Sequence, residues 1–599
     1  MTQTPQICES TVPLVPLRIW PGAVVLILLI LTRFAMMLAP EPSFGTFMLS
    51  VFGPLVCAIL ILGWWWFASR AKLRERTITT IILVLVAGIS MIPLDVTLKG
   101  FGVMLYSLPA GMAMFTLGLL LFARAGSKVR ITATMLATLA GFGIWDFIRN
   151  DGVTGDFRPE FHWRTTPTAE QTFLTSRSKI DSPKLAEEKL GEILWSDFRG
   201  PQRNGIVANV TLKTDWEATP PKEIWKHKIG PSWSSFVMAG NRLYTQEQRG
   251  EMEAVVCYRA DDGREEWSQE SPTRFWESVA GAGPRATPTL HEGALYALGA
   301  KGLLQRLDPL TGEVVWRKDL HIDGGRPEPP NWGYSSSPLV THDTVIVHAG
   351  GTDTRGLFGY DAASGDLRWS VPCGDHSYAS AQLATLNDQE LVLMLTNEGL
   401  TAVDPSTGKV TWDYAWLSPK AYRVVQPLIL DKNEVVLGTG AGIGTRRISI
   451  SSERNTNGQP TFTTKWTTLE MKPGFNDYVP YEGALYGFDA SFFACIDLET
   501  GKKRWKKGRY GNGQVLLLSQ AGQLLIVAES GELVLVAADP SDLKELGRIP
   551  ALNGKTWNHP ILVNGRLYLR NAEEIACFAL PLETPQALPE SKDEEKPAL

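Results

Sequence analysis

Apolar residues are concentrated in five long runs at the start of the chain. The runs cover residues 21–39, 46–68, 77–94, 101–123 and 131–148. Each approaches the roughly 20 residues that a helix needs to cross about 30 Å of hydrocarbon. A cleaved signal peptide would explain the first run and none of the other four. The pattern predicts an N-terminal all-α membrane domain over residues 1–148, with five transmembrane helices.

The charges between the runs predict the orientation of these helices. Segments 69–76 and 124–130 hold four and three Lys/Arg, whereas 40–45 and 95–100 hold one between them. Because positive loops stay inside, the two basic segments are expected in the cytoplasm. Five crossings then place everything after residue 148 on the outer side of the cytoplasmic membrane, with membrane lipid as a partner of the first domain.

Three ionisable residues lie at the predicted outer ends of the helices: Arg33, Asp95 and Asp146. Ionisable groups within a membrane are candidates for function. Alternatively, Arg33 extends to the outer headgroups and both aspartates lie in water. The second interpretation is favoured, because all three residues are near an interface. The first would require them to cluster in a polar pocket of the outer leaflet.

Beyond residue 194 the apolar residues alternate with polar ones, which indicates strands and excludes helical repeat arrays. One motif recurs there: Asp, two or three small residues, Gly, three residues and Trp. The Gly stands four residues before the Trp in five copies, and successive repeat Trp are 39 to 54 residues apart. That period is typical of four-stranded propeller blades. Asp and Gly form a tight turn, and the Trp is expected to pack between blades. The repeat Trp are Trp225, Trp267, Trp316, Trp369, Trp412, Trp466 and Trp505.

A second signal counts the blades. Two short apolar strands around a tight turn occur eight times, starting at residues 236, 288, 338, 381, 427, 478, 517 and 560. The last copy lacks the outer strand of a four-stranded blade. Residues 222–228 have the pattern of an outer strand, but no three inner strands of a blade precede them. We therefore expect an all-β eight-bladed propeller over residues 195–580, closed by an N-terminal strand that removes open sheet edges. Residues 149–194 are expected to form a polar linker with a helix over 184–194, and 581–599 a disordered tail.

Charge and composition narrow the function. The net charge is −5 at pH 7; residues 1–148 contribute +5, so the rest of the chain carries −10. An acidic outer domain argues against nucleic-acid binding, because phosphate contacts need a basic surface. Six cysteines in 599 residues exclude a disulfide scaffold. The eight histidines lack metal-ligand spacing, so no metal site is predicted from them.

The hairpin register predicts which residues face the propeller axis, because alternate side chains of a strand share a face. Directly before each hairpin lies a residue of a mostly polar ring: Ser235, Thr287, Ser337, Ser380, Gln426, Asp477, Leu516 and His559. Two residues earlier lies a rim: Trp233, Arg285, Ser335, Tyr378, Val424, Phe475, Gln514 and Trp557.

Two interpretations of these rings stay open. They could bind a planar or anionic ligand, stacked on Trp233 or Trp557 with Arg285 holding a carboxylate. They could also simply line a water-filled channel. The candidate cofactor-binding residues are Trp233, Arg285, Tyr378, Gln426 and Trp557. The candidate catalytic residues are Asp477 and His559, although a structural role is favoured for His559.

The Asp-x-x-Thr-Gly-x-x-x-Trp repeats, as at 308–316 and 404–412, resemble the PQQ-like β-propeller repeat family. Residues 195–201 with Gly205 resemble the segment that leads into such propellers in bacterial proteins. The family includes quinoprotein dehydrogenases, so the resemblance implies PQQ and Ca²⁺ as cofactors together with a catalytic carboxylate. It also includes bacterial propellers that bind no quinone. This chain lacks the adjacent cysteine pair of many dehydrogenases and any Asp/Glu-dense loop for Ca²⁺.

Two functions follow. The first is a binding or scaffold module that presents its faces to proteins, other ligands or cell-envelope material outside the cytoplasmic membrane. The second is a membrane-bound quinoprotein dehydrogenase that oxidises a sugar or alcohol and passes electrons to membrane quinone. The missing cysteine pair and calcium cluster favour the first.

Overall fold

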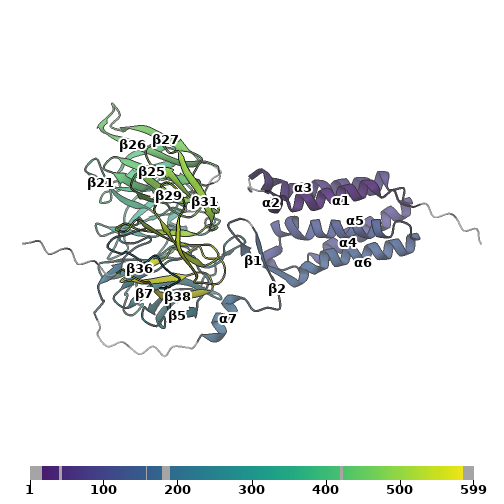
Figure 1. Cartoon of the computed structure of the whole chain (residues 1–599), viewed down its shortest axis with the longest axis horizontal. Coiled ribbons are helices and arrows are strands. Elements are labelled where there is room, and N and C mark those ends of the chain that lie inside the picture. The colour runs from purple at the N-terminus through teal and green to yellow at the C-terminus, as the bar shows by residue number, and fades with distance from the viewer. Residues whose placement is uncertain are drawn as a thin grey trace, which may run out of the picture. The chain divides into compact units, whose positions relative to one another are not determined.

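The computed structural model describes residues 16–39, 44–156, 158–177, 189–418, 422–440 and 442–583. The chain divides into two compact units, one helical and one built of strands (Figure 1). The first comprises Met1–Val153 and Arg158–Pro167, and the second Thr154–Phe157 and Thr168–Leu599. Most of the predicted tail and part of the predicted linker helix lie outside the described residues.

Helices occupy all five predicted apolar ranges of the first unit. Among the described helices, Gly45–Ala68 and Val103–Leu121 are long and apolar enough to cross a membrane, and Trp20–Arg33 is apolar but shorter. The prediction of five spans is therefore supported for two segments. The helices are α1 (Trp20–Arg33), α2 (Ala35–Leu38), α3 (Phe44–Gly63), η1 (Trp64–Ala68), α4 (Leu73–Ser90), η2 (Val96–Leu98), η3 (Val103–Ser107), α5 (Leu108–Leu121), α6 (Ser127–Gly143) and η4 (Ile144–Phe147). The hairpin β1 (Ile148–Val153) and β2 (Pro159–Trp163) follows.

The three ionisable residues singled out in this unit have different partners. The guanidinium of Arg33 lies 5.0 Å from the ring centroid of Tyr106. Asp95 accepts a hydrogen bond from the main-chain N–H of Thr97, at 3.0 Å. Arg164 lies 3.3 Å from the Asp95 carboxylate and donates to the main-chain oxygen of Asp146 at 2.9 Å. Arg164 thus connects the two aspartates, and Arg33 packs on an aromatic ring.

The linker contains one helix, at a different place from the predicted one. α7 (Ala169–Ser176) begins with a capping box in which Thr168 Oγ1 accepts from the Gln171 N–H at 3.0 Å. Glu170 forms an ion pair of 2.9 Å with Arg274 of the propeller. The predicted helix over 184–194 is wrong at its described end, because β3 (Ile193–Trp195) pairs there with a propeller strand instead.

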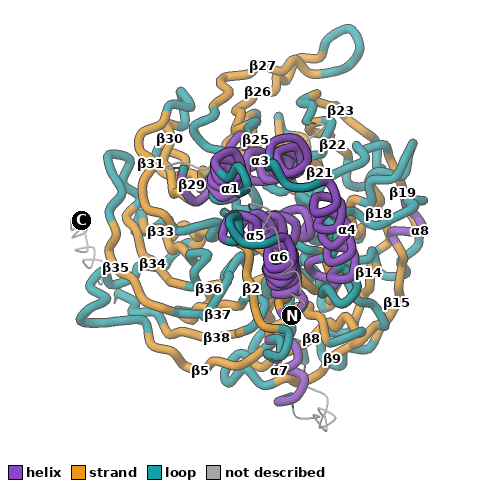
Figure 2. The backbone as a smooth tube through the Cα atoms, turned by 90° about the vertical axis from the view of Figure 1, so that its right-hand side faces the viewer, coloured by secondary structure: helices purple, strands orange, loops and turns teal. Residues whose placement is uncertain are grey.

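Eight antiparallel blades form the second unit, as the hairpin count predicted (Figure 2). Blades 1 to 4 are β6 (Val237–Ala239), β7 (Arg242–Arg249), β8 (Met252–Arg259), β9 (Glu265–Ser271); β12 (Thr289–His291), β13 (Ala294–Leu298), β14 (Leu303–Leu307), β15 (Val314–Asp319); β16 (Leu339–Thr341), β17 (Thr344–His348), β18 (Leu357–Asp361), β19 (Leu367–Val371); and β20 (Gln382–Leu386), β21 (Gln389–Leu395), β22 (Gly399–Val403), β23 (Val410–Ala415). Between them lie the small hairpin β10 (Trp276–Glu277) and β11 (Gly281–Ala282), and α8 (Leu320–Gly324).

Blades 5 to 8 complete the ring. They are β24 (Leu428–Asp431), β25 (Glu434–Thr439), β26 (Gly444–Arg454), β27 (Pro460–Thr468); β28 (Val479–Tyr481), β29 (Ala484–Asp489), β30 (Phe492–Asp497), β31 (Lys503–Arg509); β32 (Gln514–Leu518), β33 (Gln523–Val527), β34 (Glu532–Ala537), β35 (Glu545–Pro550); and β36 (Ile561–Val563), β37 (Arg566–Arg570), β38 (Glu574–Ala579) with β5 (Lys222–Lys228). β5 pairs antiparallel with β38, with Trp225 opposite Cys577.

The repeat motif joins neighbouring blades, as between blades 2 and 3. Trp316 Nε1 donates to the main-chain oxygen of Ala362 in the turn of the following blade, at 3.1 Å. Gly365 of that turn has a φ of +77°, and a Cβ there would lie 2.8 Å from Cδ2 of Trp316. Glycine is therefore needed both for the turn conformation and for the close approach of the indole. The Trp thus packs between blades, as the repeat suggested.

Candidate functional site

The predicted polar ring forms, and its side chains link neighbouring blades. The Ser235 N–H donates to Thr287 Oγ1, the Thr287 N–H to Ser337 Oγ, and the Ser337 N–H to Ser380 Oγ, each at 2.9 Å. Each hydroxyl thereby satisfies a buried main-chain donor of the preceding blade, which would otherwise cost free energy. The ring residues hold the inner ends of the blades together, a role that neither sequence interpretation included.

Residues 195–207 cross the propeller axis beside this ring. β3 pairs with β6 of blade 1, and β4 (Ile206–Val207) pairs in parallel with β32 of blade 7. Between these strands, Arg199 and Arg203 are 3% and 4% exposed. Arg199 Nη2 donates to the main-chain oxygen of Tyr478 in blade 6, and Arg203 Nη2 donates to the main-chain oxygen of Ser337 in blade 3, each at 3.1 Å. We call residues 195–207 the crossing segment, because it fills part of the axial channel.

The two candidate catalytic residues are buried beside the crossing segment. Asp477 Oδ1 lies 3.6 Å from Arg199 Nη1 and accepts the Gln426 N–H at 2.9 Å. Burial raises the pKa of Asp477, although the charge of Arg199 opposes this. His559 Nδ1 is 3.0 Å from the Pro560 oxygen, and burial lowers the His559 pKa to about 3, so the imidazole is neutral near pH 7. Both side chains contact protein groups within the ring.

The aromatic rim contains a packed cluster around Trp557. Its ring centroid lies 4.8 Å from that of Trp233 and 4.6 Å from that of Phe475. Trp557 Nε1 donates to Glu529 Oε1 at 2.9 Å, and the ammonium of Lys555 lies 4.8 Å from the Trp557 centroid. These rings already pack against one another at tilted angles and lie beside a cation of the same chain.

Arg285, the predicted carboxylate binder, already has a carboxylate partner. Its Nη2 is 2.9 Å from Glu277 Oε1 and donates to the Gly281 oxygen at 3.1 Å. Its guanidinium also lies 4.6 Å from the ring centroid of Phe275. Burial lowers the pKa of Arg285, and Glu277 counters this by favouring the charged form. The expected free cation on the rim is therefore a neutralised pair.

The remaining candidates lie in other surroundings. Tyr378 belongs to a second aromatic cluster, with ring centroids 5.0 Å from Trp332 and 6.0 Å from Tyr422, and its hydroxyl accepts the Trp332 N–H at 3.2 Å. Gln426 Nε2 donates to Gln382 Oε1 at 3.3 Å. The structure brings Trp233 and Trp557 together and separates them from the surroundings of Tyr378 and Gln426.

A planar quinone with carboxylates needs an open ring face and a free cation, and Ca²⁺ needs six or more oxygen ligands. Trp233 and Trp557 contact each other, and Arg285 is paired. Within the described residues, no group of three or more His, Cys, Asp or Glu could hold a metal ion. As placed, the predicted residues do not fit PQQ with Ca²⁺.

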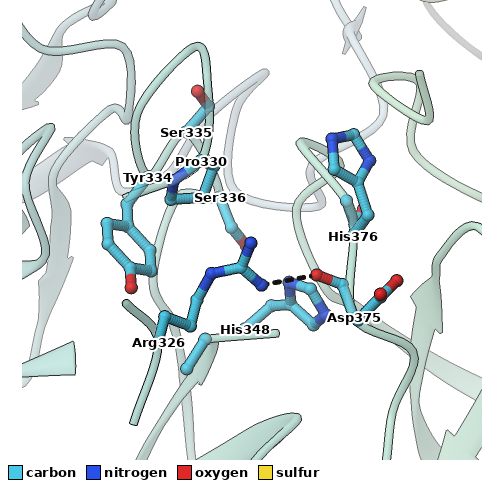
Figure 3. Close-up of a pocket in the computed structure, with 10 residues that line it drawn as sticks. Arg326, Pro330, Tyr334, Ser335, Ser336, His348, Asp375 and His376 are labelled. Carbon is cyan, nitrogen blue, oxygen red and sulfur yellow. Dashed lines mark hydrogen bonds between the residues drawn. The ribbon is translucent and has the colours of Figure 1, made fainter. Parts of the chain in front are cut away.

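A small polar cavity lies between the loops that precede β16 and β20 (Figure 3). Across the cavity, Arg326 Nη1 donates to the main-chain oxygen of Asp375 at 2.6 Å. Burial lowers the pKa of the adjacent His348 to about 4. The volume is about 10 Å³, room for one water molecule that could bond to the otherwise unpartnered hydroxyls of Tyr334 and Ser336.

A larger cavity of about 200 Å³ lies beside the crossing segment. Its walls are Arg199, Gln202, Arg203 and Asn204 of that segment and the inner strands β20 and β24 of blades 4 and 5. We call it the axial cavity. Sequence reasoning missed it, because the alignment of hairpins says nothing of what a preceding segment places inside the ring.

Sequence comparison identifies the repeats of the propeller. Residues 214–327 and 273–507 match the family model described as outer membrane protein assembly factor BamB, a model of PQQ-like repeats. Outer membrane protein assembly factor BamB of Yersinia pestis is 21% identical over 154 residues, which cover 24% of this chain and 37% of that relative. The match thus spans little more than a third of the relative's length.

Solved structures with a similar fold were also found. BamB from Moraxella catarrhalis has a TM-score of 0.45 and 14% identity, covering 60% of this chain and 100% of its own. Quinohemoprotein alcohol dehydrogenase from Comamonas testosteroni has a TM-score of 0.44 and 12% identity, covering 70% of this chain and 85% of its own.

Proposed function

Because the propeller belongs to the PQQ-like repeat family, we propose that the chain is a membrane-anchored binding or scaffold module. Its propeller would engage protein or other cell-envelope partners on the outer side of the cytoplasmic membrane. The observation that carries this proposal is that the chain itself occupies part of the axial channel. The polar ring bonds blade to blade, and Arg199 and Arg203 of the crossing segment occupy part of the channel. Groups available to a partner therefore lie on the propeller faces and in the axial cavity.

The surface of the helical unit supports anchoring in a membrane. Ile59, Phe67 and Val84 are 70%, 88% and 64% exposed. In the interior, Arg130 Nη2 donates to Glu75 Oε2 at 2.8 Å, and both residues are buried. A water-soluble bundle has the reverse arrangement, with charged residues outside and large apolar ones inside. We infer that lipid covers this surface and that all five predicted segments span the membrane.

Reporter fusions test the anchoring and its orientation. A reporter enzyme that is active only outside the cytoplasm should be active when fused after Asn150 and inactive when inserted at Arg74. A cytoplasmic reporter should give the opposite pattern. Reversed activities, or cytoplasmic activity at both sites, would contradict the proposed outer position of the propeller.

The identity of the Yersinia pestis relative supports protein partners, because that protein is named an assembly factor for outer membrane proteins. We propose that this propeller likewise contacts proteins of the cell envelope through one of its faces. Tyr422 and Leu469, 41% and 58% exposed, lie in loops that precede inner strands and therefore mark one face. Val315, 53% exposed on the outer strand β15, lies at the outer circumference of the propeller.

Site-specific photo-crosslinking in intact cells tests this interaction. A photoreactive residue at Tyr422 or Leu469 should crosslink to one or a few defined envelope proteins, and the same residue at Val315 should not. The same crosslinks at all three positions, or none at the face positions, would contradict a specific docking face. The alternative, a quinoprotein dehydrogenase, has no specific observation in its favour and is tested by the quinone titration below.

A further inference from the structure

The crossing segment occupies the inner main-chain edge of several blades in a regular way. In blade 7, the Leu517 and Ser519 N–H groups donate to the oxygens of Gly205 and Val207, at 2.9 and 3.1 Å. In blade 2, the Leu290 N–H donates to the Ser196 oxygen at 2.8 Å. These donors stand one or three residues after the polar ring of their blades. Odd positions after the ring thus direct their main-chain groups toward the axis.

Blade 4 presents the same edge without a strand on it. β20 is the end strand of a four-stranded sheet, whereas β3 and β4 extend the sheets of blades 1 and 7 to five strands. Leu386 pairs with Gln389 across a two-residue turn. In such a hairpin the two residues that flank the turn exchange main-chain hydrogen bonds with each other, so the main-chain groups of Leu386 point toward β21. By alternation, Leu383 and Thr385 direct their main-chain groups to the axis. In the part of the chain that the structure describes, neither donates to another main chain across that edge.

The axial cavity lies along this open edge. Leu383 and Thr385 line it from β20, and Ile429 lines it from β24. The two arginines of its opposite wall already face carboxylates, since Arg203 Nη1 is 2.9 Å from Asp197 Oδ1 and Arg199 Nη1 is 3.6 Å from Asp477 Oδ1. The wall therefore offers the main-chain N–H groups of Leu383 and Thr385 and apolar contact, with no net charge for an ionic ligand to match. The main-chain oxygen of Leu383 already accepts a hydrogen bond from Gln382 Nε2 at 3.4 Å.

We propose that the axial cavity binds a short extended peptide segment of a partner protein, which adds a strand to the inner edge of β20. The chain does the same with its own residues, three in β3 and two in β4, at the start and end of the crossing segment. About 200 Å³ suits an insertion of similar length with small, uncharged side chains. Recognition by strand addition takes its affinity from main-chain hydrogen bonds. This inference rests on the proposed function and names the surface and the mode of recognition.

The probe is a displayed library of random heptapeptides, selected on the full chain in detergent. Enriched peptides are synthesised, and their affinities are measured for the unchanged chain and for variants at Thr385. Thr385→Pro removes the axial donor from an edge strand, a position that tolerates proline. Thr385→Val, the matched control, keeps the main-chain donor and replaces the hydroxyl with a methyl group. We expect Thr385→Pro to weaken binding about tenfold or more, and Thr385→Val to leave it unchanged.

Two further measurements keep the result independent of folding. Gln202→Trp narrows the cavity from the crossing segment, where the side chain is exposed, and should cause the same loss. Deuterium uptake over residues 382–386 should fall when an enriched peptide is added, because Leu383 and Thr385 gain hydrogen-bond partners. Circular dichroism spectra of all variants should match that of the unchanged chain.

The outcomes separate this inference from the proposed function. If no peptide is enriched, or if the enriched peptides bind Thr385→Pro and Gln202→Trp as tightly as the unchanged chain, the axial site is wrong. Face crosslinks from Tyr422 that persist in that case leave the binding function standing. Self-association of the chain that Thr385→Pro abolishes would identify a second copy as the occupant and overturn the partner peptide. Peptide binding at the axis without any envelope crosslink would instead remove the proposed scaffold role.

Discussion

Removing the indole of Trp316 should make an alanine at Gly365 much less harmful. Trp316 is 8% exposed and donates to the Ala362 oxygen at 3.1 Å, so Trp316→Ala should lower the free energy of unfolding by about 3–5 kcal/mol. Gly365→Ala has two costs. The left-handed backbone at φ +77° costs an alanine about 1–2 kcal/mol, and a Cβ placed 2.8 Å from Cδ2 of Trp316 adds about 1–3 kcal/mol of overpacking.

Only the second cost depends on the indole. In the Trp316→Ala background, Gly365→Ala should therefore cost about 1–2 kcal/mol, and the double-mutant cycle should give a coupling energy of about 1–3 kcal/mol. The assay is urea unfolding of the full chain in detergent, with limited proteolysis of the propeller as the readout of unfolding. Gly483 is the control, since its φ is +75° and a Cβ there meets no atom within 4 Å. Gly483→Ala should add to Trp316→Ala without coupling. Additive losses at Gly365 as well, within about 0.5 kcal/mol, would refute the contact between blades as the reason for the repeat glycine.

Four other predictions follow from contacts elsewhere in the propeller. Ser337→Ala should lower the free energy of unfolding by about 1–3 kcal/mol, because the buried Thr287 N–H loses its acceptor, and urea unfolding checks this. Deleting residues 222–228 should leave β38 with an open edge and cause aggregation or rapid proteolysis; unchanged protease resistance would mean that β5 does not close the ring. Burial raises the pKa of Glu253 from 4.5 to about 7, so the folded chain binds that proton more tightly and stability should fall as the pH rises between these values; Glu253→Gln should flatten that part of the profile of urea midpoints. PQQ added with millimolar Ca²⁺ should show no saturable absorbance change, and a change that Arg285→Ala abolishes would reinstate the dehydrogenase.

The blade count could be predicted because it rests on local signals. Each hairpin is a tight turn between two apolar strands, and each repeat turn carries its own Asp and Gly, so eight copies can be counted without knowing how they meet. The ring positions followed for the same reason, because side chains alternate along a strand. The capping box at Thr168 and Gln171 is an equally local signal, and it marks the start of α7.

The candidate site was less predictable, because its residues are defined by distant partners. The sequence predicted Arg285 to bind an anion. In the structure, Glu277, on a small hairpin between blades, lies 2.9 Å from Arg285 and is its ion-pair partner. The sequence placed Asp477 and Ser337 only as polar side chains near the propeller axis. In the structure, each accepts a main-chain hydrogen bond from the neighbouring blade. No spacing within a strand reveals such a partner.

Period, turn chemistry and hydrophobic run length are local properties, so the amino-acid sequence was enough to predict the repeat, the number of blades and the division into an apolar helical part and a strand-rich part. Tertiary structure alone decided what fills the axis. Residues 195–207 pair with strands more than 40 residues and more than 300 residues further along the chain, and Arg199 and Arg203 reach blades 6 and 3. Contacts at such separation depend on the arrangement of the blades around a single axis, which brings strands that are distant in the sequence beside residues 195–207.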